Sequence, residues 1–261
     1  MIKIDRSTID PPAFLENYHK WVQEEISNYS SPSEILSDKK KYHSIKTKYR
    51  SYDIYTKTLQ KALKDLGNGK CAYCETSLGD KKSLQIEHFK PNGIPKYLKL
   101  TCDWTNLLPS CISCNSAKLE ADPEKDPIID PSIENPEPLF IFDPFTGLIA
   151  TNPKCSPIEK KMADNTIEIV DLNREELIII RAAHFEGHTN ELQINLGLIW
   201  GLWDGNRFGG DMVSFKKIIL KIDELEKKTS EFSAFGKIFK NESKLIKSLQ
   251  DVYHSASNPS V

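Results

Sequence analysis

The chain has 261 residues, of which 28% are charged, and its formal net charge is −2 at pH 7. This length allows one large or two small domains with a sizeable core, and the near-neutral charge is not the global signature of a nucleic-acid-binding protein. The sequence has no apolar run of about 18 residues, and its first segment lacks the basic-then-apolar order of a signal peptide. We therefore expect a cytoplasmic protein with no membrane partner.

Charge is distributed unevenly along the chain. Residues 38–99 hold fifteen Lys and Arg against six Asp and Glu, whereas residues 100–145 hold two against nine. Most charge runs of this kind are solvated faces. Because the basic stretch surrounds the first of two cysteine pairs and the candidate site residues that follow it, we favour a surface that faces phosphate groups.

The first region, residues 1–69, is expected to be helical. Asp10 precedes two prolines and apolar residues at helical spacing, which predicts a helix over about 12–28. A lysine-rich link leads into a second helix, which Gly67-Asn68-Gly69 ends. The apolar stripe of that helix is predicted to comprise Tyr52, Tyr55, Leu59, Leu63 and Leu66.

Two Cys-x-x-Cys pairs, Cys71/Cys74 and Cys111/Cys114, define the next region, residues 70–120. In a reducing cytoplasm, paired thiols indicate a metal site rather than disulfides. Four thiolates suit one tetrahedral zinc in a closed structural site, so we predict that these cysteines bind Zn²⁺. A redox role is the weaker interpretation, because there are four thiols and no thioredoxin-like pattern around them.

Residues 121–153 are acidic and rich in proline. Five prolines fall between positions 123 and 138, a density that excludes a regular helix and predicts an ordered loop or a linker. Apolar segments at 139–143 and 148–151 flank a Pro-Phe-Thr-Gly turn and predict a β-hairpin. The stretch 120–138 is a candidate for docking a partner, and a solvated connection is the equal alternative.

The last region, residues 154–261, is expected to be helical. Asn173 and Glu176 have capping-box spacing and predict a helix that reaches about Trp200. Two further amphipathic helices are predicted at about 212–228 and 231–253.

Polar side chains inside the cysteine region suggest chemistry beyond a structural zinc. Glu87 and His88 are adjacent, Asn106 precedes the second cysteine pair, and Asn115 directly follows it. Carboxylate and amide oxygens are the ligands that a hard cation such as Mg²⁺ prefers, and Glu87 and Asn115 can supply them. Neutral histidine, whose unperturbed pKa is about 6.5, is a suitable general base near neutral pH.

The order Glu-His-x-x-Pro, Asn-Leu and Cys-x-x-Cys-Asn-x-x-Lys resembles the HNH endonucleases of the ββα-metal kind. His88, Asn106 and Asn115 stand in the three positions of that motif. A wider likeness includes the Ile-Asp-Arg start with its Pro-Pro, the Lys-Cys-Ala-Tyr-Cys-Glu run and an Asp-Leu-Asn helix start. These features resemble the PtuB family, the HNH subunits of Septu-type and retron-associated anti-phage systems.

The resemblance implies an α+β fold that is mostly helical. A ββα-metal HNH finger, stapled by the four-cysteine zinc site, would be embedded between N-terminal helices and a C-terminal helical region. His88 would be the general base, and Glu87 and Asn115 would hold a catalytic Mg²⁺ or Mn²⁺. Asn106 would brace the loop and orient His88. The family more often has Asp where Glu87 stands, so this sequence offers a longer arm to the metal.

The same resemblance implies a substrate and a partner. The activity would be metal-dependent hydrolysis of DNA phosphodiester bonds in anti-phage defence, with Lys90 and Lys118 as candidate phosphate contacts. A PtuA-like SMC-type ATPase would be a separate subunit, which is consistent with the lack of a P-loop motif in this sequence.

Two other functions remain open from the sequence. A non-catalytic zinc-stapled module that binds nucleic acid or protein would explain the cysteines and the basic stretch, but not the register of Glu87, His88 and Asn115. An HNH nuclease that acts on RNA is the other alternative, because such a module grips a phosphodiester and reads little else.

Overall fold

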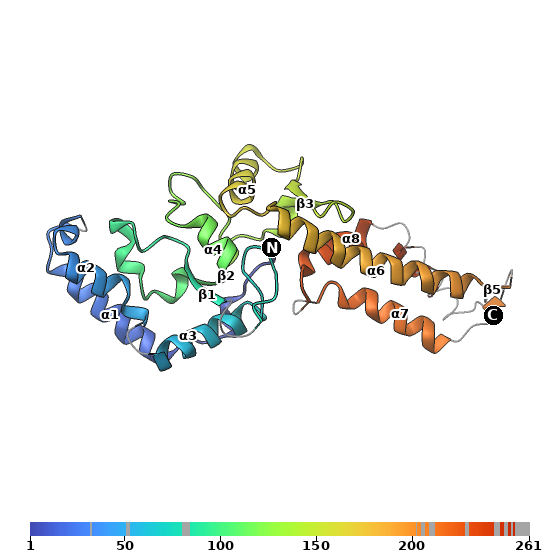
Figure 1. The fold of residues 1–261 in the computed structure, drawn as a ribbon, viewed down its shortest axis with the longest axis horizontal. Coiled ribbons are helices and arrows are strands. Elements are labelled where there is room, and N and C mark those ends of the chain that lie inside the picture. The colour runs from blue at the N-terminus through green and yellow to red at the C-terminus, as the bar shows by residue number, and fades with distance from the viewer. Residues whose placement is uncertain are drawn as a thin grey trace. The chain divides into compact units, whose positions relative to one another are not determined.

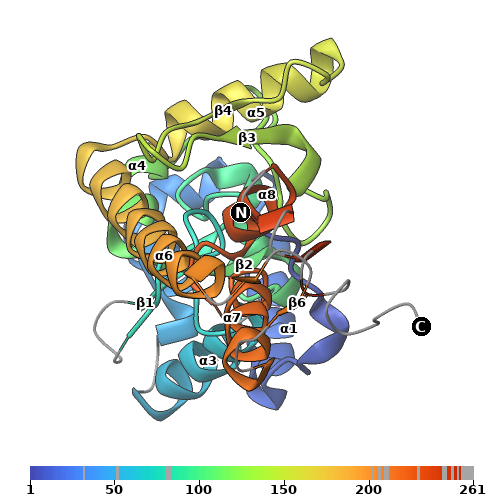
Figure 2. The same ribbon diagram turned by 90° about the vertical axis from the view of Figure 1, so that its right-hand side faces the viewer.

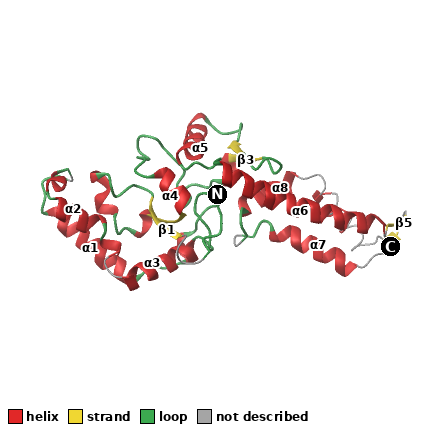
Figure 3. Cartoon of the chain, in the orientation of Figure 1, coloured by secondary structure: helices red, strands yellow, loops and turns green. Residues whose placement is uncertain are grey.

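The computed structural model shows a mostly helical protein with three small two-stranded sheets among its described residues (Figure 3). The described residues are 1–31, 33–50, 53–79, 84–201, 203–204, 207–208, 212–227, 230–242, 246–247, 250–251 and 253. The chain divides into two compact units (Figure 1). Unit 1 comprises Met1–Leu139 and Thr151–Leu172, and unit 2 comprises Phe140–Ala150 and Asn173–Val261.

Three helices form the N-terminal part of unit 1. Helix α1 spans Ala13–Ser27 and confirms the helix predicted over 12–28. Helix α2, Lys39–Lys46, occupies the lysine-rich stretch that was predicted to be a link. The residue that marks the start of α2 in the sequence is Asp38, whose side chain caps the helix by accepting a hydrogen bond from the Lys41 backbone N–H. Short 3-10 turns at Arg6–Thr8, Glu34–Ser37 and Lys48–Arg50 connect these elements.

Helix α3, Asp53–Leu66, confirms the second predicted helix. Its predicted leucines are buried, whereas Tyr52 and the side chain of Tyr55 lie outside the described residues. The turn after α3 requires glycine at two positions. Gly69 has a φ of +76°, and a Cβ at Gly67 would lie 2.6 Å from the Lys70 carbonyl oxygen. The chain therefore turns sharply from α3 into the first cysteine pair.

A two-stranded antiparallel sheet and a short helix follow. Strand β1, Leu84–His88, pairs with β2, Leu107–Cys111, so that His88 lies opposite Leu107. Helix α4, Ile112–Lys118, begins directly after β2. Helix α3 packs against both strands, beside which it lies in Figure 1. Two 3-10 turns, Pro95–Leu100 and Trp104–Asn106, fill the connection between the strands.

The proline-rich stretch after α4 was predicted to be either an ordered loop or a linker. In the structure it is an ordered loop. Its residues Ile128 and Ile129 are buried, and the backbone N–H of Ile129 donates to Thr166 Oγ1 at 2.9 Å. Thr166 belongs to helix α5, Pro157–Ile169, which had not been predicted as a separate element. The sequence feature that marks the start of α5 is a complete capping box at Ser156, with a proline in the first turn of the helix.

Among its described residues, unit 2 contains the predicted hairpin and the helices that follow it. Strands β3, Phe140–Phe142, and β4, Ile149–Thr151, pair around Gly147, whose φ is +75°. The helices with described bounds are α6, Glu175–Gly201; α7, Met212–Glu224; and α8, Ser233–Glu242. Helices α6 and α7 lie side by side (Figure 2), and the two-residue strands Trp203–Asp204 and Arg207–Phe208 pair between them in sequence.

Asn173 has a different partner from the one that its spacing predicted. Its side-chain amide donates to the carbonyl oxygen of Ile149 at 2.8 Å and accepts from the Ile149 N–H at 3.0 Å. Asn173 therefore joins the start of α6 to strand β4. The first turn of α6 uses the Arg174 carbonyl, which accepts from the N–H groups of Leu177 and Ile178. In the part of the chain that the structure describes, none of the helices is long and apolar enough to cross a membrane.

Candidate functional site

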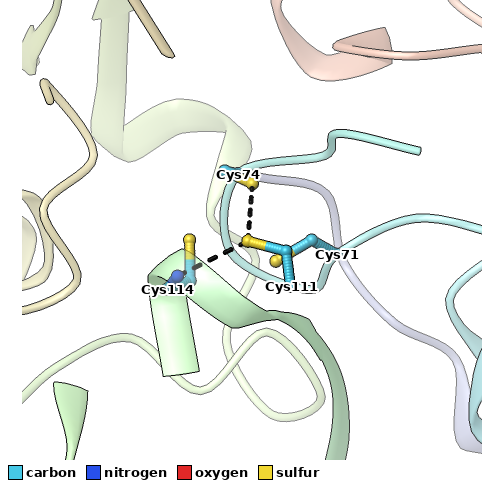
Figure 4. Close-up of side chains that lie close together, drawn as sticks. All are labelled: Cys71, Cys74, Cys111 and Cys114. Carbon is cyan, nitrogen blue, oxygen red and sulfur yellow. Dashed lines mark hydrogen bonds between the residues drawn. The ribbon is translucent and has the colours of Figure 1, made fainter. Parts of the chain in front are cut away.

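Four cysteines of unit 1 bring their sulfur atoms together, as predicted (Figure 4). The Sγ atoms of Cys71, Cys74, Cys111 and Cys114 all lie within 4.8 Å of one another, and those of Cys74 and Cys111 are 3.7 Å apart. A tetrahedral zinc with Zn–S bonds of about 2.3 Å holds its sulfurs about 3.8 Å apart. The cluster therefore has the size and the ligand chemistry of a metal site such as that of zinc.

The cysteines come from a turn, a strand end and a helix start. Cys71 and Cys74 lie on the turn closed by the bridge between Lys70 and Ser77. Cys111 ends β2 and is the N-cap of α4, where its sulfur accepts from the Cys114 N–H at 3.4 Å. A metal ion at this cluster would fix the α3–β1 turn to the junction between β2 and α4.

The thiols influence one another strongly because they are so close. Hydrogen bonds from neighbouring thiols lower the pKa of Cys74, and the bond from Cys114 lowers that of Cys111 to about 7. Burial raises the pKa of Cys71. Two of the four thiols are thus already disposed to ionise, and thiolate is the form that binds metal.

His88 lies at the end of β1 with a single well-placed partner for its ring. Its Nε2 is 2.9 Å from the carbonyl oxygen of Thr101. Since a carbonyl oxygen can only accept, Nε2 carries the proton and Nδ1 is the basic nitrogen of the neutral ring. The side-chain nitrogen of Asn92 is 3.4 Å from Nε2, but this amide donates to the Lys46 carbonyl at 2.9 Å, so Thr101 sets the tautomer.

The surroundings keep His88 neutral. The residue is buried, and the ring of Tyr49 meets it edge-on with centroids 4.9 Å apart. Burial lowers the pKa of His88 to about 4, and the nearby Lys118 charge acts in the same direction. The imidazole is therefore an unprotonated base throughout the neutral pH range.

Glu87 and Lys118 form a buried ion pair. Lys118 Nζ lies 2.7 Å from Glu87 Oε1 and donates to the His88 carbonyl at 3.0 Å. The hydroxyl of Tyr73 donates to the same Glu87 oxygen at 3.2 Å. Burial raises the pKa of Glu87, and the Lys118 charge opposes that shift. Lys118, a candidate phosphate contact, is only 1% exposed and holds Glu87 and β1 in place instead of facing solvent.

Asn106 ties the two ends of the strand connection together. Its Oδ1 accepts from the Lys90 N–H at 2.8 Å, and its Nδ2 donates to the Lys90 carbonyl at 3.0 Å. Its own carbonyl oxygen accepts from the Phe89 N–H at 2.9 Å. These bonds hold the two residues that follow His88 against the start of β2.

The remaining predicted residues lie on either side of this arrangement. Asn115 is half-buried in the first turns of α4, the helix that also carries Lys118. Lys90 is 38% exposed, and its Nζ pairs with Glu124 Oε1 at 3.1 Å. Three contributors that the sequence did not indicate are Tyr73, Thr101 and Tyr49, whose roles depend entirely on tertiary contacts.

Glu87 and Asn115, the expected ligands of a catalytic cation, meet only some of the requirements of such a site. Glu87 and Asn115 offer oxygen atoms of the type that Mg²⁺ prefers. However, Oε1 of Glu87 already receives an ammonium and a hydroxyl, so a divalent cation at this carboxylate must compete with Lys118. Among the described residues, the four cysteines are the one group of metal-ligating side chains that converges.

Two known proteins share sequence similarity with the chain. It is 43% identical over 76 residues to the Septu protein PtuB of Bacillus thuringiensis, which is 29% of each chain. It is 27% identical over 176 residues to the Septu protein PtuB of Bacillus mycoides strain KBAB4, covering 57% of this chain and 58% of that protein. The chain thus matches less than two thirds of either relative's length. No protein-family model matches the sequence. The similarities support a PtuB-like protein.

Proposed function

We propose that the chain is a metal-dependent HNH endonuclease that hydrolyses DNA phosphodiester bonds. The observation that carries this proposal is the setting of His88: a buried, neutral imidazole whose Nε2–H is held by Thr101, which leaves Nδ1 as the base. His88 follows Glu87 at the end of β1, and its partner strand β2 leads directly into α4, the helix that carries Asn115. This combination of residues and elements supports the resemblance to ββα-metal nucleases.

The proposed reaction is the attack of a water molecule on the phosphorus atom. Nδ1 of His88 takes a proton from that water as its oxygen bonds to phosphorus. The bond from phosphorus to the 3′ oxygen breaks, and the 3′ oxygen leaves with the bonding electrons and takes a proton from a solvent water molecule. Thr101 holds the ring in the required tautomer, and Asn106 fixes the backbone after His88. A divalent cation bound at Glu87 and Asn115 would supply charge stabilisation for the phosphate and the leaving oxygen.

We further propose that this activity serves anti-phage defence. The names of the two relatives, both Septu proteins, support this assignment. The partner would be a PtuA-like SMC-type ATPase subunit. That subunit would bind and hydrolyse ATP, for which this sequence has no P-loop motif.

One observation favours a second candidate, a non-catalytic zinc-stapled module. Lys118 neutralises Glu87 inside the protein, as a purely structural ion pair would. In that case His88 would be a packed core histidine, and nucleic acid or protein would bind without being cut.

Cleavage separates the two candidates. Purified protein is incubated with duplex DNA and with RNA, with Mg²⁺ or with EDTA, alone and with the ATPase subunit. We expect Mg²⁺-dependent cleavage of DNA that falls by roughly 10²–10⁴-fold in His88→Ala. His43→Ala, which removes an exposed histidine from α2, is the matched control and should cleave like the parent. Equal rates for His88→Ala and the parent would leave the binding module as the function, and preferred cleavage of RNA would change the substrate.

A further inference from the structure

Three lysines of unit 1 are paired with carboxylates from the segment that follows α4. We call Lys46, Lys90 and Lys96 the lysine surface, and Glu120, Asp122 and Glu124 the acidic cover. These residues belong to the basic stretch 38–99 and the acidic stretch 100–145 of the sequence. The two charge runs therefore meet in the folded protein instead of forming separate solvated faces.

The ion pairs run along the whole cover. Lys46 Nζ lies 3.1 Å from Glu120 Oε1, and Lys90 Nζ lies 3.1 Å from Glu124 Oε1. Lys96 Nζ reaches two carboxylates, Glu124 at 2.8 Å and Asp122 at 2.9 Å. The carboxylates that pair with these lysines thus stand at every second residue of the cover.

The lysine surface adjoins the candidate base. Lys90 is two residues beyond His88, and its backbone is held by Asn106. The carbonyl oxygen of Lys46 accepts from Asn92, whose side chain touches the His88 ring. A phosphodiester strand that reaches His88 would therefore pass close to Lys46 and Lys90.

At one end of the lysine surface, the Glu120 carboxylate packs closely over Gly93. A Cβ at Gly93 would lie 1.7 Å from Glu120 Oε1 and 2.9 Å from Lys46 Nζ, so a side chain at this position would displace the carboxylate. The cover reaches this position through Leu119, which ends α4 with a φ of +44°, a conformation that L-residues rarely adopt.

The cover is held by contacts that a competing polyanion can replace. The side chains of Glu120 and Glu124 are 60% and 51% exposed, and ion pairs at such exposure are weak because water and salt screen them. Asp122 is the anchored member: it is buried and accepts from the Tyr97 hydroxyl at 2.6 Å. Glu120 and Glu124 can therefore leave the lysines while Asp122 keeps the segment attached.

We propose that the acidic cover is an internal stand-in for a nucleic-acid backbone, which occupies the lysine surface until duplex DNA displaces it. This inference rests on the proposed function for the identity of the polyanion. It assigns Lys46, Lys90 and Lys96 as backbone contacts, and Glu120 and Glu124 as the groups that weaken binding in the free protein.

The test is DNA binding without cleavage. Binding of a fluorescent 20-base-pair duplex is measured by anisotropy, without added divalent cation, for the parent and for Glu120→Gln/Glu124→Gln. Each freed lysine that meets a phosphate should tighten binding up to about eightfold at 0.1 M salt, because each contact adds about 0.9 to the slope of log K against log salt. We expect a slope steeper by about 1–2 and tighter binding for the variant.

A matched control separates the cover from net charge. Glu16→Gln/Asp65→Asn removes two carboxylates that pair with Lys20 and Lys61 within α1 and α3, with the same change in net charge. We expect this control to bind DNA within about twofold of the parent, since no phosphate-facing surface is uncovered. In the cover variant, adding Lys46→Gln and Lys90→Gln, which removes the two lysines that lose their carboxylate partner, should remove the gain.

The outcomes are distinct from those that test the nuclease. Three outcomes would overturn the inference, whether or not the protein cuts DNA. The cover variant could bind DNA with the same affinity and salt slope as the parent, it could bind more weakly, or the control variant could gain as much affinity as the cover variant. Tighter binding specific to the cover variant, in protein that cuts nothing, would uphold the inference and end the nuclease proposal. Zinc content and circular dichroism of both variants verify their fold, and Glu124→Gln alone provides a milder second variant.

Discussion

At the scale of single residues, the site depends on groups that the interior keeps in one protonation state. His88 is neutral because its ring is buried and because Thr101 accepts its one N–H. Glu87 is buried beside Lys118 and Tyr73. Their ionisation is thus coupled to the packing of the strand pair, and stability measurements can detect it.

Burial of His88 should make stability depend on pH in mildly acidic solution. Its pKa is about 4 in the folded protein, against about 6.5 for a free histidine, so between these values the unfolded chain binds the additional proton. The stability that it contributes is complete above about pH 6.5, decreases as the pH falls, and is lost near pH 4, a difference of about 3 kcal/mol.

Urea unfolding of the parent and of His88→Gln, each from pH 4.5 to 7.5, measures this contribution. The pH dependence of the parent should be steeper, and the difference between the two curves isolates His88 from other acid-labile groups. Parallel curves would show that the His88 ring is as accessible to protons in the folded protein as in the unfolded chain.

The Glu87–Lys118 pair should be strongly destabilised by removal of one partner only. Lys118→Met leaves the Glu87 carboxylate buried without its cation, which typically lowers the free energy of unfolding by about 3–5 kcal/mol. The double variant Glu87→Gln/Lys118→Met removes both charges and should recover most of that loss. Urea unfolding of the parent, both single variants and the double variant gives the complete double-mutant cycle. An unchanged free energy of unfolding in Lys118→Met would indicate that Lys118 lies at the surface instead of in a buried ion pair.

At the scale of elements, the cysteine cluster connects three pieces of backbone: the turn after α3, the end of β2 and the start of α4. Cys111 is at once the last residue of β2, the N-cap of α4 and a member of the cluster. The turn that bears Cys71 and Cys74 is joined to β2 by the bond from the Ala72 N–H to the Pro109 carbonyl, at 2.8 Å. Loss of the metal should therefore disturb the strand pair and α4 together.

Cys111→Ser should lower both metal content and stability. Elemental analysis of the parent, purified without added metal, is expected to find about one zinc per chain. Because metal binding at such sites supplies folding free energy, Cys111→Ser should be zinc-poor and partly unfolded by circular dichroism. Cys155→Ser is the control, since Cys155 lies outside the cluster and is half-buried. Zinc-free Cys111→Ser with a native spectrum and unfolding midpoint would contradict a structural role.

At the scale of the whole molecule, unit 1 is assembled from two separate stretches of chain. Helix α5, which follows the hairpin of unit 2, belongs to unit 1 with the proline-rich loop. The contacts are specific: Thr166 accepts from the Ile129 N–H, and Asn165 donates to the Pro127 carbonyl at 3.0 Å. The sequence-based boundary at residue 154 therefore separates α5 from segments with which it folds.

Truncation tests this assembly. A fragment of residues 1–139 lacks α5 and uncovers Ile128 and Ile129, whereas a fragment of 1–172 retains their partners. Uncovering a buried isoleucine costs about 1.5–3 kcal/mol, so the shorter fragment should unfold at clearly lower urea concentration. Zinc content should be the same in both. Identical unfolding midpoints would show that α5 is not part of the cooperative unit.

The sequence by itself determined the features that depend on local spacing. The four cysteines, the helix α1, the end of α3 at Gly67–Gly69 and the hairpin around Gly147 were all predicted, because thiol spacing, amphipathic periodicity and turn glycines act over a few residues. The same local rules would have found α2 and α5 from the caps at Asp38 and Ser156. The likeness of Glu87, His88, Asn106 and Asn115 to a nuclease motif also rests on residue type and order alone.

Only the tertiary structure decided which groups these residues meet. Lys118 turns inward to Glu87, Thr101 selects the tautomer of His88, and Asn173 binds strand β4 instead of capping its own helix. The basic and acidic runs meet as the lysine surface and the acidic cover, a contact between Lys46 and Glu120 across 74 residues. Such pairings depend on how the chain brings distant segments together. Side-chain charge and spacing specify the groups that need partners, but the packed backbone selects the partners within reach.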